Sequence, residues 1–561
     1  MRSEATGRRD VTGRRLGSDP AQRPADLVLR GGAVYRGGED GAPTFDEALA
    51  VTEGRIVAVG SEREVERLAG SATVVVDVEG RTVVPGLIDS HLHLVRAGLT
   101  WRDEIRWDEV PSLDEALSLL RSEADRRPPG SWLRVVGGWH PGQFAELRMP
   151  TREELTERFP KNPVYVQLLY EEAVLNDAGM LGCGIVPGAE DPPGGTFARD
   201  PATGEPTGIV RGMGAFNHCL SRMPSTHPGD QVGGIRDLMR ELNGLGLTGA
   251  VDVGGLGLPP ENYEPLFALW RAGGTTLRTR LYVGAQTRDR ECEELTGWMR
   301  HARQGFGDGW LRYVGIGEII VFGCHDLEGL TGFPADDASL RELERVVREV
   351  AVRGWPLHMH AVLDETASAV LDVWDRVARE HPIADLRWSL AHAEPISAAN
   401  LDRVRALGCG IAVQDRLVYR AADSARAWGD GAVRHGPPLR DILDRGIPLG
   451  AGTDATRVAS PNPWVSLWWL VTGKTLDGGP RRVPEQRLDR VRALDAYTVG
   501  SAWFSLEEHE RGRLDESMAA DLAVLSDDYF TVDDDALPGL RSELTLVDGH
   551  AVHATGPFAG L

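Results

Sequence analysis

The stretch VVPGLIDSHLHLVRAG, residues 83–98, passes from an apolar run into two histidines, His91 and His93, one residue apart. In an extended strand, residues i and i+2 point to the same side. Both imidazoles would therefore face one way, as the ligands of a single metal ion must. Two exposed histidines at a strand end would show the same spacing, and the stretch alone favours that ordinary interpretation. The sequence around it decides between the two.

Seven further apolar segments have the length and composition of buried strands. They span residues 246–255, 276–285, 312–321, 355–362, 386–394, 409–415 and 447–455. Helical patterns such as SLRELERVVREVAVRG, residues 339–354, separate most of them. Together with the first segment, these strands and helices predict an α/β fold, a (β/α)8 TIM-like barrel. The chemistry of such a barrel lies at the C-terminal ends of its strands.

The two ends of the chain differ from the middle, with short Val- and Ile-rich strands and glycine turns but no helical period. We expect residues 25–82 and 506–561 to form one small β-sandwich domain completed by both termini, and residues 83–505 to form the barrel. Residues from about 100 to 235 are too many for one crossover and predict an inserted subdomain. It would cover the barrel mouth and shape substrate selection, or serve as a scaffold without substrate contact.

Composition narrows the class of partner. A formal charge of −23 and a pI near 5.1 disfavour nucleic acid, so we expect a small-molecule substrate. The five cysteines show no C-x-x-C spacing and support neither a disulfide framework nor a zinc knuckle. No apolar stretch has membrane-spanning length, and residues 1–24 lack the apolar core of a signal peptide. We expect a cytoplasmic protein with a disordered leader at 1–24, no membrane partner, and homo-oligomer formation left open.

Polar residues suited to binding a metal stand at the ends of five predicted strands. They are His91 and His93 on the first, Glu318 on the fourth, His358 and His360 on the fifth, His392 on the sixth and Asp454 on the eighth. Nitrogen and carboxylate donors that converge from strand ends suit a borderline divalent ion with one position open for water. A packed apolar core rarely needs several histidines. This set predicts a metal centre.

The segment VVPGLIDSHLHL resembles the strand-one signature of the amidohydrolase superfamily. The pieces around it resemble amidohydrolase family 3, the YtcJ-like metal-dependent hydrolases: DPATGEPTGIVRG, LGLTGAVDVGG, HMHAVLDETA, SLAHAEPI, GAGTDAT and GRLDESMAADLAVL. The resemblance covers residues from about 25 to 556. It implies a metal-bearing barrel with a β-sandwich beside it.

The resemblance also implies roles for the candidate ligands. His91 and His93 would bind the more buried metal ion. His360 and His392 would bind a second ion or, as in one-metal relatives, bind and orient the first. Asp454 would bind the first ion and act as the proton shuttle. The implied cofactor is one or two divalent ions, expected to be zinc.

Two neighbours of these ligands carry separate expectations. Asp89 would support the strand-one histidines without touching the metal. His358 should face the same way as His360, but HAVLDETA resembles the family's segment only with His360 in the ligand position. A hydrogen-bonded structural role for His358 is favoured over metal contact, and His358 is also a candidate substrate contact.

The fourth strand departs from the family, whose members commonly carry a carbamylated lysine there. This chain has EIIVFG, residues 318–323, and its only lysines, Lys161 and Lys474, lie elsewhere. Glu318 offers two oxygens without carbamylation and is favoured as a bridge between two ions. The alternatives are an unligated general acid/base beside a single ion, and a salt-bridged residue with no catalytic role.

The insertion departs from the family as well. LYEEAVLND, residues 169–177, places Glu171 where relatives often carry a histidine, and GGWH places His140 where an aspartate is common. Trp139, His140, Tyr170 and Glu171 are therefore candidate substrate-binding residues. Each fits ordinary packing of the subdomain about equally well.

These residues predict a hydrolase that cleaves a C–N bond, in an amide or cyclic amide, of a small molecule. A bound divalent ion would lower the pKa of its water to about 7, and Asp454 would carry the proton to the departing nitrogen. The alternatives are a mononuclear deaminase that uses Glu318 as general acid/base, and a non-catalytic metal-binding barrel. The near-complete set of expected donors argues against the non-catalytic barrel.

Overall fold

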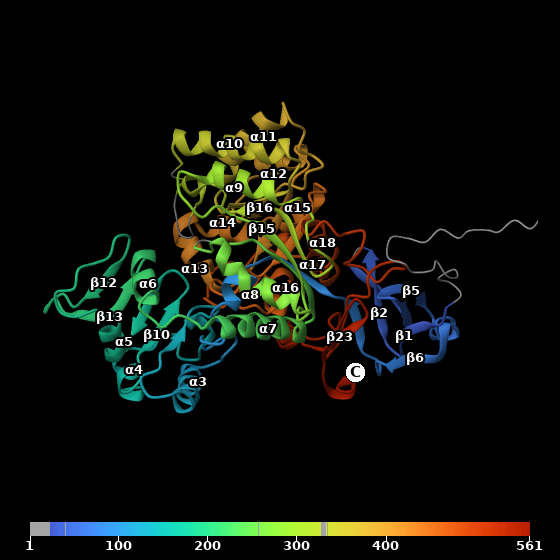
Figure 1. The fold of residues 1–561 in the computed structure, drawn as a ribbon, viewed down its shortest axis with the longest axis horizontal. Helices are drawn as coiled ribbons and strands as arrows, with labels where there is room; N and C mark the ends of the chain where they lie inside the picture. Colours follow the sequence, from blue (N-terminus) through green and yellow to red (C-terminus); the bar gives the residue numbers. More distant parts are fainter. Residues whose placement is uncertain (1–22, 40, 256, 327–331, 334) are drawn as a thin grey trace, which may run out of the picture.

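The computed structural model describes residues 23–39, 41–255, 257–326, 332–333 and 335–561, so residues 1–22 of the expected leader lie outside the described residues. In this part of the chain, eight parallel strands form the sheet at the centre of the molecule (Figure 1). They are β8 (Leu87–Leu92), β14 (Leu247–Asp252), β15 (Arg278–Val283), β16 (Leu311–Glu318), β17 (Leu357–Ala361), β18 (Ser389–His392), β19 (Gly410–Gln414) and β20 (Leu449–Gly452). Each coincides with one predicted segment, and the barrel prediction is confirmed.

The barrel strands follow one another in chain order, from β8 to β20. The first and last strands meet at a seam, where the N–H of Asp454 donates to the carbonyl of His91 at 2.9 Å. The carboxylate of Asp89 spans the same seam. Its Oδ1 accepts the N–H of His91 at 2.9 Å, and its Oδ2 accepts the N–H and hydroxyl of Thr453 at 3.1 and 2.7 Å. These bonds close the ring at the end where the candidate ligands lie.

Helices connect successive strands and cover the outside of the barrel. They include α7 (Pro228–Gly244), α8 (Glu264–Arg271), α9 (Glu291–His301), α10 (Asp337–Val352), α11 (Asp364–Ala378), α12 (Ala398–Ala406), α15 (Leu439–Asp444), α16 (Pro463–Thr472) and α17 (Arg490–Tyr497). In α10, Asp336 caps the N-terminus by accepting the N–H of Ser339 at 2.8 Å. Leu343, Val346 and Val350 are buried at helical spacing, so one face of α10 packs inward.

Side chains fill the barrel interior and the space at the start of its strands. Phe504, the last residue of α18 (Val499–Phe504), packs with Tyr282 of β15, whose hydroxyl donates to the Phe504 carbonyl at 2.9 Å. Nearby, Arg280 of β15 pairs with Glu507 at 2.6 Å, with side chains only 1% and 3% exposed. Arg511 also pairs with Glu507. Buried ion pairs thus join a barrel strand to the segment that leads into the C-terminal strands.

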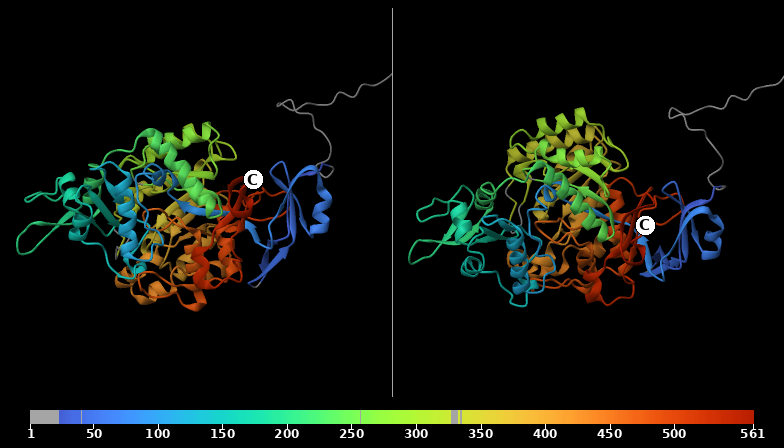
Figure 2. Two further views of the ribbon diagram at one scale, coloured as in Figure 1. Left: turned by 90° about the horizontal axis from the view of Figure 1, so that it is seen from below. Right: turned by 60° about the horizontal axis from the view of Figure 1, so that its bottom comes forward.

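Strands from both ends of the chain combine in one sheet, as predicted. A six-stranded sheet has the order β23 (His550–Ala554), β22 (Ser542–Val547), β21 (Leu522–Leu525), β7 (Thr82–Pro85), β2 (Ala33–Glu39) and β3 (Ala42–Asp46). A four-stranded sheet has the order β5 (Arg55–Gly60), β4 (Ala48–Thr52), β1 (Ala25–Arg30) and β6 (Ala69–Asp77). The sheets share an apolar core that includes Leu29, Val51, Leu522 and Leu546. Figure 2 shows this sandwich at one side of the barrel. The predicted domain limits stay predictions.

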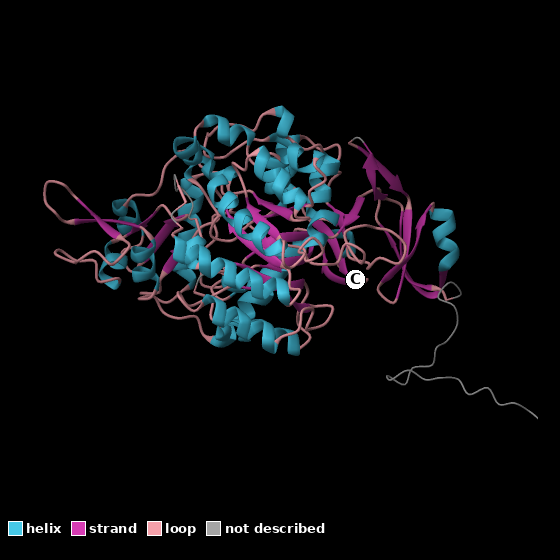
Figure 3. Cartoon of the chain, turned by 90° about the horizontal axis from the view of Figure 1, so that it is seen from above, coloured by secondary structure: helices cyan, strands magenta, loops and turns pink. Residues whose placement is uncertain are grey.

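The inserted subdomain leaves the barrel between β8 and β14. Its sheet has the order β12 (Thr196–Arg199), β13 (Pro206–Arg211), β11 (Glu172–Leu175), β10 (Val164–Leu168) and β9 (Leu133–Val135). It lies on the side of the barrel opposite the sandwich (Figure 3). Gly137 has a φ of +131°, and a Cβ there would lie 2.2 Å from the carbonyl oxygen of Arg457. The subdomain therefore passes closely against the loop after β20.

No helix within the described ranges combines the length and the apolarity that a membrane crossing requires.

Candidate metal centre

All six expected ligands lie at the C-terminal ends of barrel strands. They are His91 in β8, His93 directly after it, Glu318 at the end of β16, His360 in β17, His392 at the end of β18 and Asp454 shortly after β20. None is more than 7% exposed. The fold thus gathers donors from both ends of the barrel sequence into one buried site.

His91, His93 and Asp454 form a first cluster. Oδ1 of Asp454 lies 3.0 Å from Nε2 of His93 and 3.6 Å from Nε2 of His91. Nδ1 of His93 lies 2.7 Å from the carbonyl oxygen of Gly254, so this nitrogen donates and Nε2 keeps a lone pair toward the cluster. One ligand atom from each of the three residues lies within 4.8 Å of the others. This geometry can hold one divalent ion.

His360 and His392 form a second cluster. Nδ1 of His360 and Nε2 of His392 are 2.9 Å apart. The other nitrogen of His360, Nε2, faces Asp326, 3.0 Å from its Oδ1 and 2.7 Å from its carbonyl oxygen. Because Nε2 donates to Asp326, Nδ1 of His360 keeps the lone pair that a metal would need.

Glu318 lies between the two clusters. Its Oε1 is 3.4 Å from Nε2 of His93. Its Oε2 is 3.5 Å from Nε2 of His91, 3.2 Å from Nδ1 of His360 and 3.7 Å from Nε2 of His392. One carboxylate therefore reaches histidines of both clusters.

The donor set fits a divalent metal ion. Nε2 of His91 is buried and has no hydrogen-bond partner among the described residues, and such an atom is costly to leave unpaired. A cation would satisfy it. Imidazole and carboxylate are the donor types that zinc and similar ions take from proteins.

The electrostatic environment keeps both carboxylates ionised. Burial acts to raise the pKa of Asp454, but the imidazoles of His91 and His93, 3.6 and 3.0 Å from its Oδ1, outweigh it and hold that pKa below its ordinary value. Burial acts in the same direction on Glu318, but the charge of His91 and the neighbouring imidazoles of His360 and His392 lower its pKa well below the usual range. An ionised carboxylate is the form that binds a cation.

Two of the donors stand on unusual backbone. His392 has a φ of +72° and Asp454 a φ of +55°, a left-handed conformation that residues other than glycine seldom adopt. Hydrogen bonds hold both in place: the N–H of His392 donates to Oε1 of Gln414, and that of Asp454 to the carbonyl of His91, each at 2.9 Å. Such backbone is often found at functional sites.

His358 is fully buried, and both of its ring nitrogens face protein atoms. Nε2 lies 2.9 Å from Nδ1 of His91, and Nδ1 lies 2.8 Å from Oγ of Ser389. This is the arrangement expected of a hydrogen-bonded structural histidine, and the role of His358 stays a prediction. Asp89 bonds to the backbone of His91 rather than to its ring, and burial raises the pKa of Asp89 to about 6.

Two residues of the loop after β16 belong to this site and were not among the predicted residues. Asp326 is fully buried and, besides facing His360, accepts the N–H groups of Val362 and Leu363 at 3.1 and 2.8 Å. The ring of His325 stacks on that of His360, with centroids 4.0 Å apart. The sequence signal was the His-Asp pair in GCHD, but no ligand spacing marks it.

Trp139 and His140 have partners within the subdomain or its borders. Trp139 is fully buried, packs on Trp107 with ring centroids 4.8 Å apart, and donates its indole N–H to the carbonyl of Gln167 at 3.1 Å. His140 caps the short helix η3 (Pro141–Gln143) by accepting the N–H of Gly142 at Nδ1. Burial lowers the pKa of His140 to about 4.

Tyr170 and Glu171 lie in the turn between β10 and β11. Tyr170 is half-buried against the apolar core of the subdomain, and Glu171 is exposed. A substrate role for these two residues, and for Trp139 and His140, stays a prediction.

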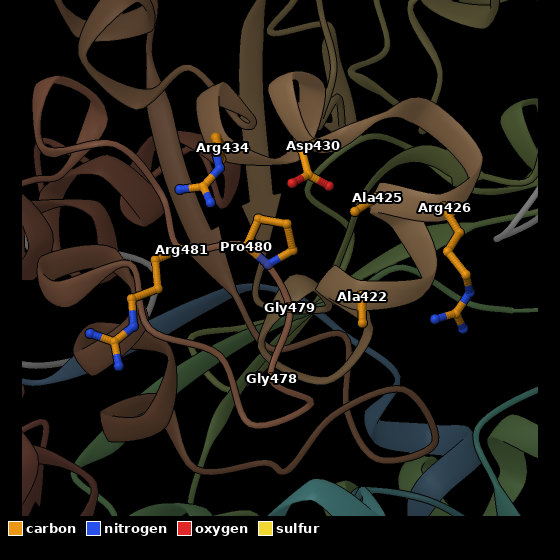
Figure 4. A pocket seen from close by; sticks show the side chains of 9 residues that line it. All are labelled: Ala422, Ala425, Arg426, Asp430, Arg434, Gly478, Gly479, Pro480 and Arg481. Atoms are coloured by element: carbon orange, nitrogen blue, oxygen red, sulfur yellow. The ribbon is translucent and has the colours of Figure 1, made fainter.

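A pocket of about 530 Å³ lies at the surface formed by α13 (Leu417–Trp428), α14 (Asp430–His435) and the loop after α16. Figure 4 shows the side chains of Arg426 and Arg481 pointing away on opposite sides, with Asp430 and Arg434 at the remaining edge. None of the predicted site residues lines it. This pocket is therefore separate from the candidate metal centre.

A (β/α)8 barrel that gathers four histidines and two carboxylates at its strand ends has the architecture of the metal-dependent barrel hydrolases. Residues 74–553 match the model of the amidohydrolase family known as Amidohydro_3, and the chain belongs to that family. It is thus an enzyme of the amidohydrolase family.

Individual relatives agree with this assignment. YtcJ of Bacillus subtilis (strain 168), named as an amidohydrolase, is 27% identical over 94% of this chain and 99% of its own length. N-substituted formamide deformylase of Arthrobacter pascens is 28% identical over 90% of this chain and 94% of its own. The fold is similar to the crystal structure of an uncharacterized metal-dependent hydrolase from Pyrococcus horikoshii OT3, with a TM-score of 0.64, 22% identity, and coverage of 91% and 99%.

Proposed function

We propose that this enzyme cleaves the C–N bond of an amide or cyclic amide in a small molecule, with two divalent ions, most simply zinc, bridged by Glu318. The observation that carries the proposal is the position of the Glu318 carboxylate, 3.4 Å from Nε2 of His93 and 3.2 Å from Nδ1 of His360. His91, His93 and Asp454 would hold one ion and His360 and His392 the other. Glu318 would take the place of the carbamylated lysine that is common in relatives.

The chemistry needs an activated water and a proton acceptor. A divalent cation, when bound, lowers the pKa of a water molecule and polarises the carbonyl under attack. Asp454 would accept the proton of that water and deliver it to the departing nitrogen. Oδ1 of Asp454 makes both contacts with the histidines, which leaves Oδ2 for the proton transfer.

The geometry favours this function over a one-metal deaminase. A deaminase of that kind would need Glu318 free of metal, so that it can move protons. Here both carboxylate oxygens of Glu318 lie within 3.5 Å of imidazole nitrogens. We therefore give Glu318 a bridging role.

The relative named as an N-substituted formamide deformylase, 28% identical, makes formamides the first substrates to test. The formal charge of −23 agrees with a small molecule rather than nucleic acid as partner. We also propose that the protein is cytoplasmic.

Metal content per chain tests the proposal. Protein loaded with Zn²⁺ and freed of excess ion should contain two ions per chain, and Glu318→Ala should contain one or none. Glu510→Ala is the control, because that side chain is 53% exposed and far from the donors in sequence. One ion in the wild type and one in Glu318→Ala would refute the bridge and favour the deaminase.

A further inference from the structure

The loop after β16 brings one more imidazole to the metal centre. His325 stacks on His360, with ring centroids 4.0 Å apart and an angle of 28° between the ring planes. His360 is itself 3.2 Å from Glu318 and 2.9 Å from Nε2 of His392. His325 therefore lies against one member of the donor set, His360.

His325 differs from the other histidines of the site in what its nitrogens do. His91, His93, His358, His360 and His392 are all at most 7% exposed and have ring nitrogens that face one another, backbone carbonyls or carboxylates. His325 is only partly buried. Neither of its ring nitrogens makes a hydrogen bond in the described part of the chain.

The neighbouring residue fixes this ring in place. Asp326 bonds to Nε2 of His360, to the N–H groups of Val362 and Leu363, and to the hydroxyl of Thr366. These four contacts tie the loop after β16 to the end of β17. Because Asp326 is held so firmly, His325 is held beside the donors without bonds of its own.

The imidazole ring of His325 carries an N–H donor. A donor beside a metal centre can bind the carbonyl oxygen of a substrate. A fixed donor of this kind stabilises the negative charge that develops on the oxygen during attack.

We propose that His325 is a further catalytic residue, whose ring N–H donates a hydrogen bond to the carbonyl oxygen of the amide substrate. This inference rests on the proposed function, since it needs a substrate carbonyl at the metal centre. It assigns the role to an imidazole that binds no metal. No bond is made or broken by His325, and its proton stays on the ring.

Three variants of the full-length, zinc-loaded enzyme separate the outcomes: His325→Ala, His325→Gln and the control His301→Ala, whose residue ends α9 away from the site. Zinc content is measured first. Binding of acetohydroxamic acid, a small carbonyl-bearing metal chelator, is then measured by calorimetry, and turnover is measured with an N-substituted formamide.

We expect His325→Ala to keep its zinc, to bind acetohydroxamic acid about 10-fold more weakly, and to lose about 10²-fold in kcat. His325→Gln, which restores an N–H donor, should recover part of both losses, and His301→Ala should behave as the wild type.

If His325→Ala lost zinc, His325 would be a metal ligand, and the inference would be wrong. If His325→Ala kept its full zinc content and showed unchanged hydroxamate binding and turnover, the proposed substrate contact would be wrong. Wild-type protein that takes up no divalent ion would overturn the proposed function itself. These three results are distinguishable from one another.

Discussion

Nε2 of His358 lies 2.9 Å from Nδ1 of His91, and Nδ1 of His358 lies 2.8 Å from the hydroxyl of Ser389. This chain of contacts fixes the ring of His91 so that its Nε2 faces Asp454 and Glu318. In this arrangement His358 would position the candidate metal ligand His91.

Replacing His358 tests this positioning role. His358→Ala should weaken zinc binding about 10- to 100-fold, because the His91 ring loses the partner that orients it. Competition against a chromogenic chelator measures the effect. His358→Gln should recover part of the affinity, since an amide can bond to both neighbours. Unchanged zinc affinity in His358→Ala would contradict the role.

Asp454→Asn removes the proposed proton acceptor but keeps an oxygen of similar shape. We expect kcat to fall about 10²- to 10⁴-fold, while zinc content falls by less than one ion per chain. Steady-state kinetics and metal analysis on the same sample give both numbers. Asp402→Asn, with a side chain 69% exposed, is the control. Full activity in Asp454→Asn would exclude it as the proton shuttle.

The substitution Glu507→Gln breaks the buried ion pairs that join β15 to the segment leading into the C-terminal strands. Arg280 would remain buried without its carboxylate partner, and Arg511 would keep only Asp521, 3.5 Å away, so we expect a loss of about 3 to 5 kcal/mol in unfolding free energy. Urea denaturation at pH 7.5 measures it. Glu510→Gln should leave stability within about 0.5 kcal/mol. If Glu507→Gln also changed the unfolding free energy by no more than about 0.5 kcal/mol, the ion pairs of Glu507 would add no stability.

His140 should make the fold sensitive to acid. Burial lowers its pKa to about 4, below the usual value of about 6.5. Between these values the unfolded chain binds a proton that the folded chain excludes, so stability falls as pH falls through this window. In His140→Gln, the loss of unfolding free energy between pH 7.5 and 4.5 should be smaller by about 1 to 2 kcal/mol.

Urea denaturation at the two pH values measures this difference. His509→Gln, whose ring is 90% exposed, provides the comparison. Equal pH dependence in the wild type and His140→Gln would show that His140 titrates normally in the folded protein.

The barrel could be predicted because each of its strands is an apolar run between turn residues and helical segments. The convergence of His91, Glu318, His360 and Asp454 followed from topology, since the ends of parallel barrel strands meet on one face. Neither inference needed the path of a loop.

Asp326 and His325 were missed because their place depends on such a path. They follow β16 by several residues, and the contacts of Asp326 with His360, Val362, Leu363 and Thr366 bring them back to the site. The role of Trp139 could not be predicted from the sequence for a different reason. An aromatic residue suits a substrate pocket and a packed core alike, and here it packs on Trp107.

The ring of strands is joined at one seam, between β8 and β20, and the candidate ligands stand on both sides of it. His91 and His93 belong to the first strand, and Asp454 follows the last. An ion shared by them would add a further link across a seam that hydrogen bonds already close, so that metal binding would stabilise the closed ring. Removal of the metal would then lower the resistance of the protein to unfolding as well as its turnover.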